Sequence, residues 1–262
     1  MELKLVEAGT GPPVVLLHGL FGSARNFGSV QKQLAARYRV LATDLRNHGS
    51  SPHESGMSYD LQATDVLQTL RRYNAAPATL VGHSMGGKVA MYAALLSPES
   101  VARLAVCDIA PVAYPPQFHA YAQALQNLDL KPGLTRAAAD EALAADISDP
   151  TLRAFLLQGL QLGASPHWRI GLAEIAAGLP EIAAWNPPPG SRFAGPTMFL
   201  TAERSAYVRS AHRPVIKALF PAAELVALRH AGHWLHVDQP GAFLAVLGAF
   251  LDRSAAEGSP GS

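Results

Sequence analysis

Apolar residues follow two different periods along this chain. Val14–Leu17 is wholly apolar, as in a strand buried on both faces of a sheet, whereas Val30, Leu34 and Tyr38 share one face of a helix. The short runs predict strands at Leu3–Glu7, Val14–Leu17, Arg39–Thr43, Ala78–Val81, Leu104–Cys107, Pro196–Thr201 and Glu224–Leu228. The helical spacing predicts helices at Asn26–Tyr38, Leu61–Tyr73, Met85–Leu96, Ala211–Leu219 and Gly241–Leu251. This alternation indicates an α/β fold with a mostly parallel sheet flanked by helices.

The alternation stops between residues 114 and 195, a proline-rich stretch without a strand pattern. Its Ala- and Leu-rich pieces predict helices at Ala120–Leu128, Thr135–Ala145, Thr151–Leu160 and Trp168–Ala177. We therefore predict an α/β core of residues 1–113 and 196–254 and a helical cap, or lid, of residues 114–195. The small polar residues 255–262 predict a flexible tail.

Composition narrows the class of protein. Of the 262 residues, 49% are hydrophobic and 16% charged, which argues against disorder. The net charge of +1, without a basic block, gives no support for a nucleic-acid partner. No apolar run approaches the ~20 residues that span a bilayer, and the first residues lack the apolar core of a signal peptide. A single cysteine, Cys107, excludes an internal disulfide, so we expect a cytoplasmic enzyme; its oligomeric state is not determined by the sequence.

Gly82-His83-Ser84-Met85-Gly86 matches the pattern G-x-S-x-G, directly between a predicted strand and a predicted helix. A strand-to-helix turn this tight requires flanking positions without side chains, and it lifts the serine hydroxyl to the edge of the sheet. We therefore predict that Ser84 is a nucleophile. The alternative is a serine that merely caps the helix.

The same segment also matches most of a phosphate-binding loop, from Gly82 to Gly87-Lys88. Val89 then stands where that loop needs a serine or threonine to bind Mg²⁺. A nucleotide site is therefore disfavoured.

A serine hydroxyl needs an adjacent base, and His233 is the best placed of the histidines. It lies between the last predicted strand and the last predicted helix, so the base comes last in the chain. His230 and His236 lie three residues before and after His233, which suggests a metal site. This spacing does not distinguish a metal site from a loop that enters a helix. We favour capping or packing roles for those two.

Two carboxylates compete to orient the imidazole of His233. Asp108 and Glu203 each follow a late strand, and the carboxyl ends of neighbouring parallel strands lie close together. Either side chain could hold the tautomer and stabilise the imidazolium. From the residues alone the choice stays open.

Two backbone amides are needed to bind an oxyanion. One is expected from Met85, which follows the nucleophile at the positive end of its helix. The other is expected from Leu20, with Phe21 as the alternative, in the glycine-rich loop after Val14–Leu17. His18 is expected to brace this loop.

Four segments together resemble the α/β-hydrolase superfamily, and within it the small bacterial YbfF-type esterases: His18–Ser23, Asp44–Ser50, Gly82–Lys88 and Ala231–Trp234. The resemblance implies the α/β-hydrolase fold with a helical cap inserted after strand 6, the strand that here ends at Cys107. That group places its acid after strand 6, which implies Asp108. Ser205 occupies the position after strand 7 where the superfamily usually has its acid.

The resemblance further implies a carboxylic-ester hydrolase with the catalytic residues Ser84, His233 and Asp108 and without a metal or organic cofactor. Its expected substrates are short- to medium-chain acyl esters with an apolar acyl group, and acyl thioesters are the second substrate class. Two alternatives use the same fold: a cofactor-free C–C bond hydrolase or perhydrolase, and a catalytically inactive binding protein.

Overall fold

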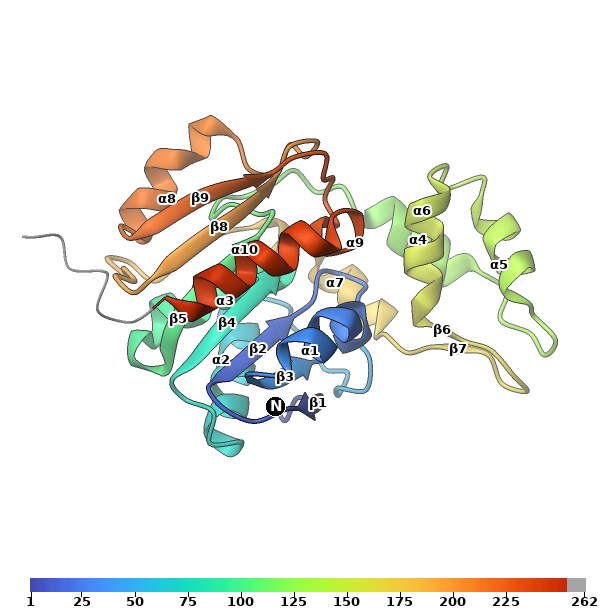
Figure 1. Cartoon of the computed structure of the whole chain (residues 1–262). Helices are drawn as coiled ribbons and strands as arrows, with labels where there is room; N and C mark the ends of the chain where they lie inside the picture. The colour runs from blue at the N-terminus through green and yellow to red at the C-terminus, as the bar shows by residue number, and fades with distance from the viewer. Residues whose placement is uncertain (254–262) are drawn as a thin grey trace, which may run out of the picture.

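The computed structural model describes residues 1–253, and these residues form an α/β sandwich around one large sheet (Figure 1). Along the sheet the strand order is β1-β3-β2-β4-β5-β8-β9. Only β1 pairs antiparallel, with β3, so the predicted mostly parallel sheet is confirmed for this part of the chain. The strands are β1 (Leu5–Ala8), β2 (Pro13–Leu17), β3 (Arg39–Thr43), β4 (Ala78–His83), β5 (Val101–Cys107), β8 (Thr197–Ala202) and β9 (Ala223–Leu228).

Helices cover both faces of the sheet, because successive strand residues point to opposite faces. Val15 and Leu17 belong to the core under α2 and α3, whereas Val14 and Leu16 belong to the core under α1 and α10. The flanking helices are α1 (Gly28–Leu34), α2 (Tyr59–Arg72), α3 (Met85–Leu96), α8 (Arg213–Leu219), α9 (Leu235–Asp238) and α10 (Pro240–Asp252). Short 3-10 helices occur at Ala24–Phe27, Pro98–Ser100, Leu157–Gly159 and Ser210–His212.

The segment between β5 and β8 is largely helical, and most of it stands to one side of the sheet (Figure 1). It contains α4 (His119–Asn127), α5 (Arg136–Leu143), α6 (Pro150–Leu156) and α7 (Leu172–Ala183). A hairpin of β6 (Leu160–Gln161) and β7 (His167–Trp168) precedes α7. The expectation of a stretch without strands was therefore wrong, because strands of two residues are too short to show a period.

Three predicted helices differ from the observed ones. The helix predicted at Thr151–Leu160 ends at Leu156, and a 3-10 turn and the start of β6 follow it. The helix predicted at Trp168–Ala177 begins only at Leu172, and it continues past Pro180 to Ala183. Ile175, Leu179 and Ile182 keep its apolar face buried, which compensates for the amide hydrogen bond that proline lacks. The helix predicted at Asn26–Tyr38 is a 3-10 turn followed by the shorter α1. The tail predicted at residues 255–262 lies outside the described residues.

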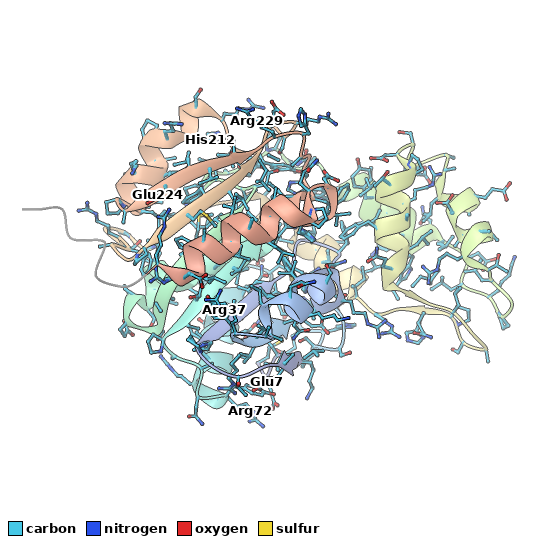
Figure 2. All side chains as sticks on the ribbon, in the orientation of Figure 1. Glu7, Arg37, Arg72, His212, Glu224 and Arg229 are labelled. Carbon is cyan, nitrogen blue, oxygen red and sulfur yellow. The ribbon has the colours of Figure 1, made fainter. Side chains whose placement is uncertain are left out.

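Several exposed charged side chains of the sheet domain form ion pairs, among them the labelled Glu7, Arg37 and Glu224 (Figure 2). Glu7 pairs with Arg39, Arg37 with Asp252, and Arg253 with Glu224. Because water screens both charges of such exposed pairs, they contribute little to stability. Across residues 1–253, no helix is both long and apolar enough to cross a bilayer.

Candidate active site

Ser84 occupies a strained turn between β4 and α3. Its backbone has φ 53° and ψ −120°, a conformation that costs energy for any residue with a Cβ. A Cβ on Gly82 would collide with the carbonyl oxygen of Gly86, and one on Gly86 would collide with the carbonyl oxygen of Leu17. The predicted need for glycine on both sides of the serine is therefore confirmed.

Asp108 and His233 meet at the same edge of the sheet. The Nδ1 atom of His233 lies 2.8 Å from Oδ2 of Asp108, across 125 positions of sequence. Oδ1 of Asp108 accepts a hydrogen bond from the Ala202 amide at 3.2 Å, and the carboxylate is buried. This arrangement holds the carboxylate still and fixes one nitrogen of the imidazole, which leaves Nε2 free to exchange a proton.

Glu203 forms its hydrogen bond with the backbone of His230 and not with His233. Its Oε2 accepts a hydrogen bond from the His230 amide at 2.7 Å, and its side chain is half exposed. This backbone hydrogen bond lowers the pKa of the Glu203 carboxyl. The residues alone left the choice between these two carboxylates open and the family resemblance implied Asp108; it is Asp108 that contacts the imidazole in the structure.

The glycine-rich loop after β2 lies against Ser84. A Cβ on Gly19 would come within 3.3 Å of the Ser84 Cβ, so the absence of a side chain there allows the close approach. The Phe21 amide donates to Nε2 of His48 at 3.0 Å and is therefore already engaged. Leu20 and Met85 both line the space beside Ser84.

Two buried histidines brace this loop. The Leu45 amide donates to Nε2 of His18, so Nδ1 of His18 carries the proton that it donates to the Gly19 carbonyl at 2.8 Å. The predicted bracing role of His18 is confirmed. Burial lowers the pKa of His18 to about 4 and that of His48 to about 3, so both rings are neutral at pH 7.

Sequence reasoning missed two neighbours of His233. His83 donates from Nε2 to the His233 carbonyl at 2.8 Å, and the Tyr207 ring centroid lies 4.4 Å from that of His233. Because His83 lies inside the G-x-S-x-G pattern, the sequence could have indicated that it belongs to the site. Nothing in the sequence singles out Tyr207. His236 is buried and stacks on Phe27, as its expected packing role requires.

Within the described chain, His233 and its neighbouring histidines are not arranged as a metal site. Among residues 1–253, no group of three or more His, Cys, Asp or Glu side chains is arranged to hold a metal ion. Cys107 is buried, and burial raises the pKa of its thiol, as expected for an inert cysteine.

Two adjoining cavities meet at Ser84, and Leu20, Gln117, Phe118 and Tyr207 line both. The larger cavity has a volume of about 250 Å³ and is also lined by Tyr121, Leu152, Phe155, His233 and Trp234. The smaller cavity, of about 40 Å³, is also lined by Tyr59, Met85, Lys88, Ile109, Tyr114 and Ile182. Residues from the segment between β5 and β8 thus wall both spaces over the serine.

Known proteins share this architecture over nearly the whole chain. Residues 12–240 match the family described as alpha/beta hydrolase fold. The sn-1-specific diacylglycerol lipase ABHD11 of Mus musculus is 39% identical over 92% of this chain and 81% of its own. Esterase YbfF of Escherichia coli is 32% identical over 92% of this chain and 93% of its own. The structure of a marine microorganism esterase superposes with a TM-score of 0.91 at 34% identity, covering 95% of this chain and 99% of that one.

Proposed function

The chain belongs to the alpha/beta hydrolase fold family, and on that premise we propose that it is a carboxylic-ester hydrolase with Ser84, His233 and Asp108 as its catalytic triad. It is an esterase/lipase-type α/β hydrolase, since relatives named esterase and lipase match it along more than nine-tenths of its length. The observation that carries the proposal is the 2.8 Å contact between Asp108 and His233, at a cavity lined by both His233 and the strained Ser84.

In the proposed reaction, Oγ of Ser84 attacks the ester carbonyl while Nε2 of His233 removes its proton. Asp108 keeps the imidazole in the required tautomer and stabilises the imidazolium that forms. The amides of Met85 and Leu20 bind the oxyanion, and the engagement of the Phe21 amide by His48 supports Leu20 over Phe21.

His233 then returns the proton to the leaving alcohol, whose bond to the acyl carbon breaks to leave an acyl-enzyme on Ser84. Water, activated by the same imidazole, attacks this ester and releases the acid.

The proposed substrates are short- to medium-chain acyl esters, with acyl thioesters as the second class. The aromatic and aliphatic lining of the larger cavity, including Phe118, Leu152 and Phe155, suits an apolar substrate group. Because these residues lie in the segment between β5 and β8, we propose that residues 114–195 act as a cap over the active site. The cytoplasmic location stays a prediction from the sequence.

Hydrolysis of p-nitrophenyl butyrate by the native protein and three variants tests the triad. We expect Ser84→Ala to lower kcat by about 10⁴-fold or more and Asp108→Asn by about 10³- to 10⁴-fold. Glu203→Gln is the matched control and should stay within about threefold of the native rate, because Glu203 bonds to His230. An inactive native protein would refute hydrolysis of simple acyl esters. If Glu203→Gln abolished activity and Asp108→Asn did not, the acid of the triad would be Glu203.

A further inference from the structure

A buried lysine close to Ser84 has no role in the proposed triad. Lys88 lies four positions after Ser84 on α3, about one helical turn along, and it is only 1% exposed. Side chains on a helix lean toward its N-terminus, so the lysine stem extends back toward the serine end of α3. Its side chain lines the smaller cavity together with Ser84 and Met85.

The surroundings of the Lys88 nitrogen contain no negative charge. Nζ lies 4.9 Å from the ring centre of Tyr114, 5.1 Å from that of Tyr59 and 5.8 Å from that of Trp185. Within residues 1–253 burial alone shifts the pKa of Lys88, and no charged partner contributes. A buried cation without a counter-ion is costly, and burial lowers the pKa of this ammonium to about 7.

Contacts within the protein use only part of the hydrogen-bonding capacity of the Lys88 ammonium. Nζ donates to the Ala184 carbonyl at 3.2 Å, which ties α3 to the end of α7, and the aromatic rings stabilise the cation. An ammonium has three N–H donors, and within the described chain Ala184 accepts one of them. Donors therefore remain for a group that enters the smaller cavity.

The position of His233 decides which part of an ester enters that cavity. His233 lines the larger cavity, and its imidazole must reach the leaving oxygen. The alcohol therefore belongs in the larger cavity, and the acyl group belongs in the smaller one, beside Met85 and Lys88. A volume of about 40 Å³ favours the short end of the proposed range of acyl groups.

We propose that the acyl group of the substrate is a short dicarboxylic acid whose free carboxylate binds the Lys88 ammonium, so that the enzyme hydrolyses monoesters of such acids. Ser84 and Lys88 line the same small cavity, so the second carboxylate of a short diacid bound to Ser84 would lie beside the Lys88 ammonium. The carboxylate supplies the counter-ion that the protein lacks. This inference rests on the proposed esterase function and specifies its substrate class.

The test compares monobenzyl succinate with benzyl butyrate, which share the leaving group and the four-carbon acyl chain. The native protein should show a kcat/KM at least about tenfold higher on the succinate monoester, because a charged hydrogen bond is gained. Lys88→Met should lower the ratio of the two kcat/KM values by about 30-fold. Lys32→Met, the same change at an exposed lysine on α1, should leave the ratio unchanged.

Lys88→Met should fold, since an apolar side chain of similar length replaces an unpaired buried charge, and its thermal midpoint checks this. Equal losses on both esters would make Lys88 merely structural and overturn the inference. A native preference for butyrate would overturn it as well, while leaving the esterase proposal intact. If the native protein hydrolyses neither ester faster than Ser84→Ala, the esterase proposal fails and the inference fails with it.

Discussion

Three of the six non-glycine residues with positive φ in the described chain lie at the proposed active site. Phe21, Ser84 and Asp108 have φ values of 61°, 53° and 51°, in the left-handed region that residues with a side chain rarely adopt. Each such conformation costs about 1–3 kcal/mol and persists only where the surrounding contacts enforce it. The strain aims the Ser84 hydroxyl into the cavity and turns the chain at Asp108 directly after β5.

The close backbone approach at Gly86 predicts that the substitution Gly86→Ala causes a large loss of stability. The added Cβ would meet the carbonyl oxygens of Leu17 and His18, which the sheet holds in place. We expect the free energy of unfolding in urea to fall by about 3 kcal/mol. Gly248→Ala is the matched control: its Cβ meets no atom within 4 Å on α10, so it should gain up to about 1 kcal/mol. Equal effects of the two substitutions would contradict the packing argument.

His236→Phe is expected to stabilise the protein. The Nδ1 atom of His236 is buried without a hydrogen-bond partner in the described chain, and the ring stacks on Phe27 at 4.9 Å. A phenyl ring keeps the stacking and removes the unsatisfied atom, so the free energy of unfolding at pH 7 should rise by about 1 kcal/mol. Urea unfolding measures this difference. A loss of stability would show that Nδ1 has a partner after all.

The helices between β5 and β8 are attached to the sheet domain to different degrees. At the end of α7, Glu181 accepts from the Met57 amide and the Ile182 carbonyl accepts from the Tyr59 hydroxyl. In contrast, α5 buries only Ala139 and Leu143. The anchor of this segment is therefore α7, whereas α5 has few buried residues.

Hydrogen exchange should report this difference. Local opening is easier where few apolar contacts must break, so we expect the amides of α5 to exchange at least about tenfold faster than those of α7. Mass spectrometry of peptic peptides covering Arg136–Leu143 and Leu172–Ala183 at pH 7 provides the measurement. Equal protection of the two helices would mean that the segment opens as a single unit.

At the scale of the whole molecule, buried neutral histidines couple stability to pH. Burial lowers the pKa of His18, His48, His83 and His236 below the value that each has in the unfolded chain. The unfolded chain therefore binds more protons as the pH falls through 6.5, and the stability that these residues provide above pH 6.5 is lost toward pH 4.

The free energy of unfolding should thus fall by up to about 1.4 kcal/mol per pH unit for each of these histidines between pH 6.5 and pH 4. Urea unfolding at pH 7.5, 6.5, 5.5 and 4.5 measures the slope. His236→Phe should reduce the slope, and His119→Gln, at an exposed position, should not. A flat profile would contradict the neutral state of the buried rings.

Local patterns predicted most of the sheet and its flanking helices, because burial on one face imposes a period of two or of 3.6 on the residues themselves. They failed where a constraint is non-local or an element is very short. The hairpin of β6 and β7 has two residues in each strand, and α7 continues past Pro180 because its buried face holds it.

The sequence by itself determined the α/β plan, the glycine-flanked turn at Ser84 and the candidacy of His233, since each depends on neighbouring residues only. Tertiary structure alone decided which groups meet. It placed Asp108 against His233 and Glu203 against His230, engaged the Phe21 amide with His48, and enclosed Lys88 among aromatic rings. These contacts join segments as much as 125 positions apart, so they depend on how the strands and loops pack rather than on any local pattern.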